Sequence, residues 1–134
     1  MASKSDYLEN KVLDHALGKT AFTMPTTVAM ALCTSIPTDA STGTTIVEAT
    51  YTGYARKAIA ASDLNAAASG TTTNANAITF AACSGGTSTI IGFAICDATT
   101  VGNVLYWGTV TSKVIDISNT PATVAISGLS VSED

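Results

Sequence analysis

The sequence predicts an all-β protein, a single jelly-roll-like β-sandwich preceded by one amphipathic α-helix at the N-terminus. Short apolar runs recur at near-regular intervals after residue 26, with Gly, Pro, Asn or Asp between them. The composition is dominated by 23 Thr and 22 Ala, and only 12% of the residues are charged. One domain is expected over residues 1–134, with a helical segment at 1–20 and the sandwich at 21–134.

A capping signal and an apolar stripe predict the helix at residues 6–17. Asp6 followed by Glu9 is similar to a capping box, and Gly18 with Lys19 ends the segment. A helix of about three turns is marginal alone in water, so its stripe must pack on its own sandwich or on a partner. The stripe consists of Leu8, Val12, Leu13, Ala16 and Leu17.

After Pro25 the hydrophobic period changes to two. Residues 28–33 alternate large apolar side chains with Ala and Cys, which predicts a strand with one large-apolar face and one small face. Residues 44–51 and 53–61 are interpreted as two short strands divided by Gly53, and residues 62–76 as a long loop. Five further runs follow, at 77–83, 89–96, 103–111, 113–118 and 122–131. Tyr106 and Trp107 are adjacent in one of them and should face opposite ways.

The charge, the lack of long apolar stretches and the cysteine usage argue against several classes of partner and site. The net charge is −4 and the six basic residues are scattered, so we expect no nucleic-acid binding. The sequence has neither a secretion signal nor an 18-residue apolar stretch, so we expect no membrane partner. Cys33, Cys83 and Cys96 lie in apolar runs without metal-ligand spacing, which indicates reduced core residues. A surface with few charges favours packing against neighbouring copies.

No motif carries catalytic chemistry. His15 borders the helical stripe, and Asp14 points about 100° away from it, so no orienting partner is in place for a general base. Asp39, Asp63 and Asp97 lie at turn edges, where Asp commonly bonds the local backbone. The sequence therefore predicts no catalytic residue, no cofactor and no metal site.

Three segments carry a resemblance to a known family: "SDYLENKVLDHALGKTAFTMPTTVAMALCTSIPTDAS", "EATYTGYARKAI" and "GFAICDATTVGNVLYWGTV". Together they resemble small virion structural proteins of tailed bacteriophages. Members share a Leu-rich N-terminal helix, a "P-x-x-V-x-x-A-L-x-T" strand, an aromatic-Ala-Arg segment and a late "G-x-x-I-x-D-A-x-x-G-N-x-L" hairpin. They are described either as tail-fibre-like proteins or as head decoration (cement) proteins.

The resemblance implies a non-enzymatic virion protein made in the cytoplasm of the host bacterium. We expect a capsid decoration protein on the capsid surface that forms a homotrimer and clamps neighbouring subunits of the major capsid protein. The alternative is a tail-fibre or tail-tip component that contacts tail proteins and binds a host-surface receptor or glycan. The expected interaction residues are Tyr7, Leu8 and Val12 of the helix, and Tyr54, Arg56 and Lys57 of the aromatic-Ala-Arg segment.

Overall fold

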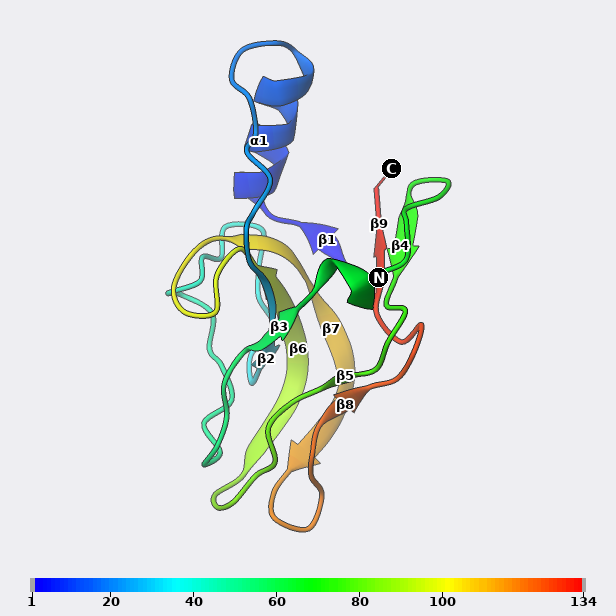
Figure 1. Ribbon diagram of the computed structural model, residues 1–134. Helices are drawn as coiled ribbons and strands as arrows, with labels where there is room; N and C mark the ends of the chain where they lie inside the picture. The colour runs from blue at the N-terminus through cyan, green and yellow to red at the C-terminus, as the bar shows by residue number, and fades with distance from the viewer. Residues whose placement is uncertain (1, 134) are drawn as a thin grey trace.

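The computed structural model describes residues 2–133. In Figure 1 the helix stands out at one end of a β-domain, beyond strand β1. Within the described range the elements are β1 (Ser3–Lys4), α1 (Asp6–Ala16), β2 (Val28–Cys33), β3 (Lys57–Ile59), the 3-10 helix η1 (Ala61–Asp63), β4 (Thr71–Thr73), β5 (Ile78–Thr79), β6 (Ser88–Cys96), β7 (Val104–Ile115), β8 (Thr123–Val124) and β9 (Ser130–Ser132).

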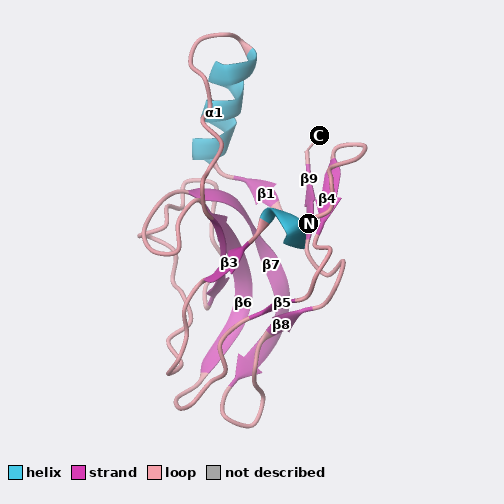
Figure 2. Ribbon diagram, in the orientation of Figure 1, coloured by secondary structure: helices cyan, strands magenta, loops and turns pink. Residues whose placement is uncertain are grey.

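The main layer is a five-stranded antiparallel sheet with the strand order β1-β7-β6-β2-β3. Figure 2 shows that the chain below α1 consists mostly of strands and loops. The long β6–β7 hairpin forms its centre. β2 adds to β6, with Met30 opposite Ile95 and Leu32 opposite Phe93. The short β1 adds to the other side of β7, so the first described residues of the chain complete a sheet made mostly by its second half.

The two faces of β2 bury different kinds of side chain, as the alternation predicts. Met30 and Leu32 belong to the main core, together with Phe93 and Ile95 of β6. On the opposite face, Ala31 and Cys33 pack with the small residues Ala94 and Cys96 and with Val104. The prediction for Tyr106 and Trp107 is also confirmed, because Tyr106 packs against the main core and Trp107 against the small cluster.

A second layer covers the main core and consists of two separate ribbons. β5 pairs with β8, and β4 pairs with β9. Ile78, Phe80, Ala122 and Leu129 from this layer close the core over the sheet. The all-β class with a single helix is thus confirmed, although the second layer is broken into ribbons where a jelly roll has a continuous sheet.

The strand expected at residues 44–51 does not form. Hydroxyl groups divert the backbone there: the amide of Thr42 donates to the Thr45 hydroxyl at 2.8 Å, and the amides of Thr50 and Tyr51 both donate to the Ser88 hydroxyl, at 2.9 and 3.1 Å. Side-chain oxygens of this kind compete with a strand ladder for backbone amides. Residues 44–51 make a single β-bridge, between Glu48 and Cys33.

The expected loop at 62–76 contains more structure than its composition predicts, because Asn74 fixes it. Asn74 is completely buried. Its side chain accepts a hydrogen bond from the amide of Leu129 at 2.8 Å and donates to the carbonyls of Asn76 and Ala125, at 2.9 and 2.7 Å. These bonds hold the loop against the C-terminal segment and bring β4 beside β9.

The three cysteines are free and buried, as the sequence predicts for reduced core residues. Burial raises the pKa of the Cys33 thiol to about 12 and that of the Cys96 thiol to about 11. Both thiols therefore stay protonated at neutral pH and pack as small apolar groups.

The small face of the sheet generates the first prediction. Ala94 is completely buried in the small cluster. We expect Ala94→Leu to lower the free energy of unfolding by about 1–3 kcal/mol, because a larger side chain there forces its neighbours off their rotamers. Urea denaturation measures the change, with Ala66→Leu in an exposed loop as the control, expected within about 0.5 kcal/mol of the parent protein. Equal stabilities of the two variants would contradict the close packing.

Candidate functional site

Residues 6–26 form an arm that leaves the domain and returns to it. α1 leads outward, and residues 17–27 run back beside it into β2 (Figure 1). The helix begins where the sequence predicts, although its N-cap is Ser5 and not Asp6. The arm protrudes from the β-domain, and its base and its far end differ in their contacts.

Ser5 joins the base of the arm to β7. This residue is completely buried, and its hydroxyl accepts a hydrogen bond from the amide of Leu8 at 3.3 Å, as an N-cap does. The same hydroxyl donates to the carbonyl of Val104, and the Ser5 amide donates to the carbonyl of Leu105 at 3.0 Å. Both carbonyls lie at an irregularity in the β6–β7 register, between Ile95 and Cys96. The start of the helix is thereby fixed to the longest strand of the sheet.

Asp39 holds the base of the arm at a second point. Its carbonyl accepts a hydrogen bond from the amide of Asp6 at 2.9 Å, and its carboxylate accepts one from the indole nitrogen of Trp107 at 3.1 Å. Because Trp107 belongs to β7 and Asp6 opens α1, the Asp39 loop bridges the helix and the strand.

Glu133, near the C-terminal end of the described residues, binds side chains of β1 and β7. The ammonium group of Lys4 lies 2.6 Å from the carboxylate of Glu133, and the Tyr106 hydroxyl donates to the same carboxylate. Burial raises the pKa of Glu133, but the hydrogen bonds from Lys4 and Tyr106 outweigh that effect and the net pKa is lowered. Both ends of the described chain therefore meet at the base of the arm.

A hairpin-like contact stiffens the outer half of the arm. The Nδ1 atom of His15 accepts a hydrogen bond from the amide of Phe22 at 3.0 Å. The carbonyl of Asp14 accepts hydrogen bonds from the amides of Lys19 and Thr20, at 2.8 and 3.1 Å. The single histidine thus has a structural partner, since it ties the helix to the returning segment.

Exposure of the helical stripe increases toward the far end of the arm. Leu8, in the first turn, is only 4% exposed, whereas Leu13 is 57% and Leu17 is 80% exposed. Leu13 and Leu17 are four residues apart and share one side of the helix. We call them the leucine pair. On the returning segment, Met24 is also strongly exposed.

The leucine pair was not among the expected interaction residues, because the stripe alone does not rank positions along the helix. With Ser5 as the N-cap, Leu8 stands at the third helical position, next to the base, and any outward-facing side chain must come later in the stripe. Of the three expected helical residues, Leu8 is buried as an anchor, Tyr7 is half-buried with Lys11 5.8 Å from the centre of its ring, and Val12 is 38% exposed.

Arg56 is buried and organises two loops. Its Nε and Nη2 atoms donate to the Glu48 carboxylate at 3.1 and 2.8 Å. The remaining donors reach backbone carbonyls: Nη1 bonds Ala98 and Val101, at 3.1 and 2.7 Å, and Nη2 bonds Gly43 at 2.7 Å. These five bonds occupy all five guanidinium hydrogens, so a contact with another protein would have to break one of them.

The other two residues of the segment differ in their surroundings. The Tyr54 hydroxyl donates to Glu48 at 2.6 Å and accepts from the amide of Leu32 at 3.1 Å, so it belongs to the same internal network. Burial and the hydrogen bond to Glu48 raise the pKa of Tyr54. Lys57 is exposed on the edge strand β3.

The two loops that Arg56 joins also approach each other closely at Gly43. A Cβ on Gly43 would lie 1.8 Å from the carbonyl oxygen of Val101.

Metal sites and membrane-spanning helices are both missing from residues 2–133. No group of three or more His, Cys, Asp or Glu side chains in this range is arranged to hold a metal ion. The one α-helix found there has 11 residues, and no helix in the range has the length and apolar character needed to cross a membrane.

The Ser5 contacts generate a prediction about the arm. Ser5→Ala removes the N-cap and leaves the buried carbonyl of Val104 without its donor, so we expect a loss of about 1–3 kcal/mol in the free energy of unfolding. Amide hydrogen exchange should accelerate most in α1. Ser3→Ala, at an exposed position of β1, is the control. Unchanged protection of α1 in the Ser5 variant would contradict the role of Ser5.

The Arg56 network generates a third prediction. Arg56→Met removes the cation that balances the half-buried carboxylate of Glu48 and takes the guanidinium donors from three carbonyls, so we expect a loss of about 3–5 kcal/mol in the free energy of unfolding. Lys57→Met, at the exposed neighbouring position, should change stability by less than about 0.5 kcal/mol. Thermal unfolding of both variants measures the difference, and comparable melting temperatures would show that the network contributes little.

Comparison with known proteins gives one family. A family model described as Podophage GP4 fiber I protein gp80 matches residues 3–132. A search of curated proteins gave no match. The matched range includes the arm, the main sheet and both ribbons of the second layer, and it agrees with the resemblance carried by the three sequence segments. The chain is therefore a bacteriophage virion structural protein and belongs to the podophage GP4 fiber I protein gp80 family.

Proposed function

We propose that the chain is a non-enzymatic subunit of a fibre-like appendage of the virion, and that the arm attaches it to a neighbouring virion protein. The observation that carries the proposal is the contrast within α1. The base of the helix is fixed by buried hydrogen bonds, whereas the leucine pair at the far end is exposed.

The isolated chain leaves the side chains of Leu13 and Leu17 largely in solvent. Burying a leucine side chain is worth about 1.5–3 kcal/mol, and the isolated chain does not obtain this from Leu13 or Leu17. A terminal segment also tends to be disordered unless it is tied down. Here Ser5, Asp39 and Glu133 tie down the base, which keeps the exposed leucines in a fixed direction. Attachment to a neighbour uses both properties.

The polar side chains support a structural role over an enzymatic one. The Glu48 carboxylate is held by Arg56 and Tyr54, and the Asp97 carboxylate accepts hydrogen bonds from the amide and side chain of Asn103, at 2.7 and 2.8 Å. His15 is bonded to the returning segment of the arm. Each of these groups stabilises a loop in the chain itself, which is the arrangement expected in a structural subunit.

The second candidate is a head decoration protein that forms a homotrimer and clamps subunits of the major capsid protein. The observation in its favour is a set of exposed apolar side chains in loops outside the arm: Ile36, Val47 and Val101. Broad contact with a capsid surface would use several such residues at once. Quantitative mass spectrometry of purified particles separates the candidates, because a copy number close to that of the major capsid protein indicates the head and a few copies per particle indicate a fibre.

The proposal predicts that Leu13→Asp with Leu17→Asp prevents incorporation of the protein into particles. Both positions are exposed, so the melting temperature should stay close to that of the parent protein. Incorporation is measured by complementing phage that lack the native protein and analysing purified particles. Asn10→Asp with Thr20→Asp adds the same charge at exposed polar positions of the arm and is the control.

Normal incorporation of the leucine variant would contradict the attachment role of the arm. The attachment surface would then have to be sought on the loops that carry Ile36, Val47 and Val101. Leu8→Asp is unsuitable for this test, because Leu8 is buried and its replacement would report on folding.

A further inference from the structure

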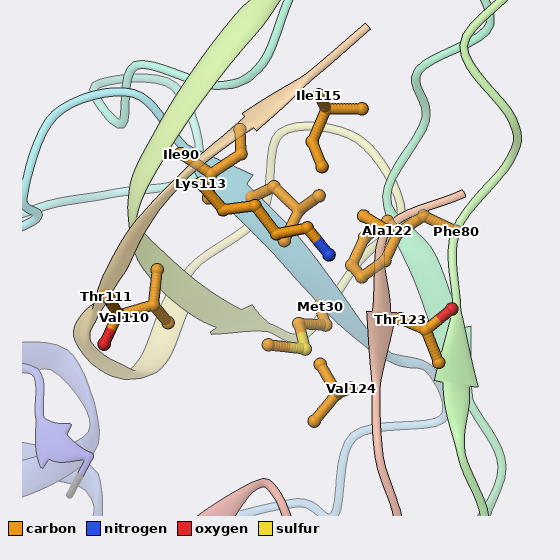
Figure 3. A pocket seen from close by; sticks show the side chains of 11 residues that line it. Met30, Phe80, Ile90, Val110, Thr111, Lys113, Ile115, Ala122, Thr123 and Val124 are labelled. Atoms are coloured by element: carbon orange, nitrogen blue, oxygen red, sulfur yellow. The ribbon is translucent and has the colours of Figure 1, made fainter. Parts of the chain in front are cut away.

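An open apolar pocket lies between the far half of β7 and β8 (Figure 3). Its volume is about 130 Å³. Main-core side chains form its floor, among them Met30, Phe80 and Ile90, and Val110 and Val124 form its sides. We call this cavity the β7–β8 pocket.

The pocket is open because the strands around it do not continue. β8 has only two residues, so the second layer ends beside the pocket. The β6–β7 register shifts between Ile90 and Gly92, and this irregularity places extra β7 residues opposite one residue of β6. As a result residues 109–114 of β7 are all exposed, and Val110 and Val114 contribute apolar surface.

The size and chemistry of the pocket fit one leucine side chain. An apolar cavity of about 150 Å³ accommodates benzene, and the four carbons of a leucine side chain need less room. The lining is almost entirely aliphatic or aromatic. The same chain exposes Leu17 at 80% on the far end of the arm, so this side chain would gain from burial in such a cavity.

One charged group borders the pocket, and the arm has the opposite charge beside its leucines. Figure 3 shows the Lys113 side chain lying across the pocket with its ammonium group toward Ala122. Within the described residues Lys113 makes no ion pair. On the arm, Asp14 lies three residues before Leu17 on the same side of the helix, and its nearest cation is Lys19 at 3.9 Å.

We propose that the arm of one copy docks in the β7–β8 pocket of the next copy. Leu17 enters the pocket, Leu13 covers its rim, and Asp14 pairs with Lys113. This inference rests on the proposed function and names a second copy of the chain as the neighbour that the arm attaches to.

The positions of the two surfaces determine the kind of assembly. The arm leaves one end of the domain, and β8 with the far half of β7 lies toward the other end (Figure 1). Two copies therefore meet through different surfaces, and each docked copy presents a free arm or a free pocket to another. Contacts of this head-to-tail type produce a closed ring, such as a trimer, or an open filament.

The test uses purified full-length protein and two variants that each remove one surface. Leu13→Asp with Leu17→Asp removes the arm surface, and Val110→Asp with Lys113→Glu removes the pocket surface. All four positions are exposed, so both variants should fold. Analytical ultracentrifugation should show assembly of the parent protein and at least about tenfold weaker association of each variant. Ile126→Asp with Lys57→Glu changes the charge equally away from the pocket and should assemble normally.

Mixing the two variants gives the decisive measurement. The arm variant retains its pocket and the pocket variant retains its arm, so an equal mixture should form a one-to-one heterodimer that grows no further. Charge exchange provides an independent check: Asp14→Lys and Lys113→Glu should each weaken association about two- to fivefold, and the double variant should recover it.

Two outcomes would overturn the inference. If the pocket variant assembles like the parent protein while the arm variant does not, the arm contacts a different surface of the second copy. If the parent protein is monomeric at all concentrations while the arm variant still fails to enter particles, the arm binds another virion protein. The second outcome rejects this inference and leaves the proposed function standing.

Discussion

Backbone groups outside the strand ladders must be paired when they are buried, and this requirement shapes the whole domain. Most of its strands have only two or three residues, so ladders alone leave many amides and carbonyls without partners. Buried polar side chains supply those partners, among them Ser5 at the base of the arm, Arg56 between two loops, and Asn74 between the 62–76 segment and the C-terminal segment. Among the described residues no buried side-chain nitrogen or oxygen lacks a hydrogen bond.

These three residues also explain which parts of the fold could be predicted from the sequence. The helix and the two faces of β2 follow from periodicity, which is local information. Ser5 and Val104 are 99 residues apart, and Asn74 and Leu129 are 55 residues apart. No local pattern reports pairs so distant. The strand expected at 44–51 was wrong for the same reason, because its amides bond Ser88 across 37 and 38 residues.

The sequence predicted that the N-terminal helix belongs to the candidate site, but it did not identify Leu13 and Leu17 as the exposed side chains. The stripe indicated that α1 must pack on something, but it gave no way to rank positions along the helix. The ranking depends on how the base is mounted, since Ser5 and the Asp39 loop bury Leu8 and leave Leu17 in solvent. Arg56 was expected at an interface as part of the aromatic-Ala-Arg segment, yet its charge is balanced internally by Glu48. Family membership, in turn, assigns the chain to the virion, and the geometry shows which part of it is built to leave the domain.

The arm is joined to the main sheet at two different places. Its start follows β1, which is bonded to β7, and its end leads into β2, which is bonded to β6. Because β6 and β7 pair with each other, tension applied to the arm passes into the sheet from both sides of its longest hairpin. The load is then shared among the hydrogen bonds of three strand pairs, and the loops between them carry little of it. A particle appendage exposed to flow would transmit force through its most extensively bonded strands.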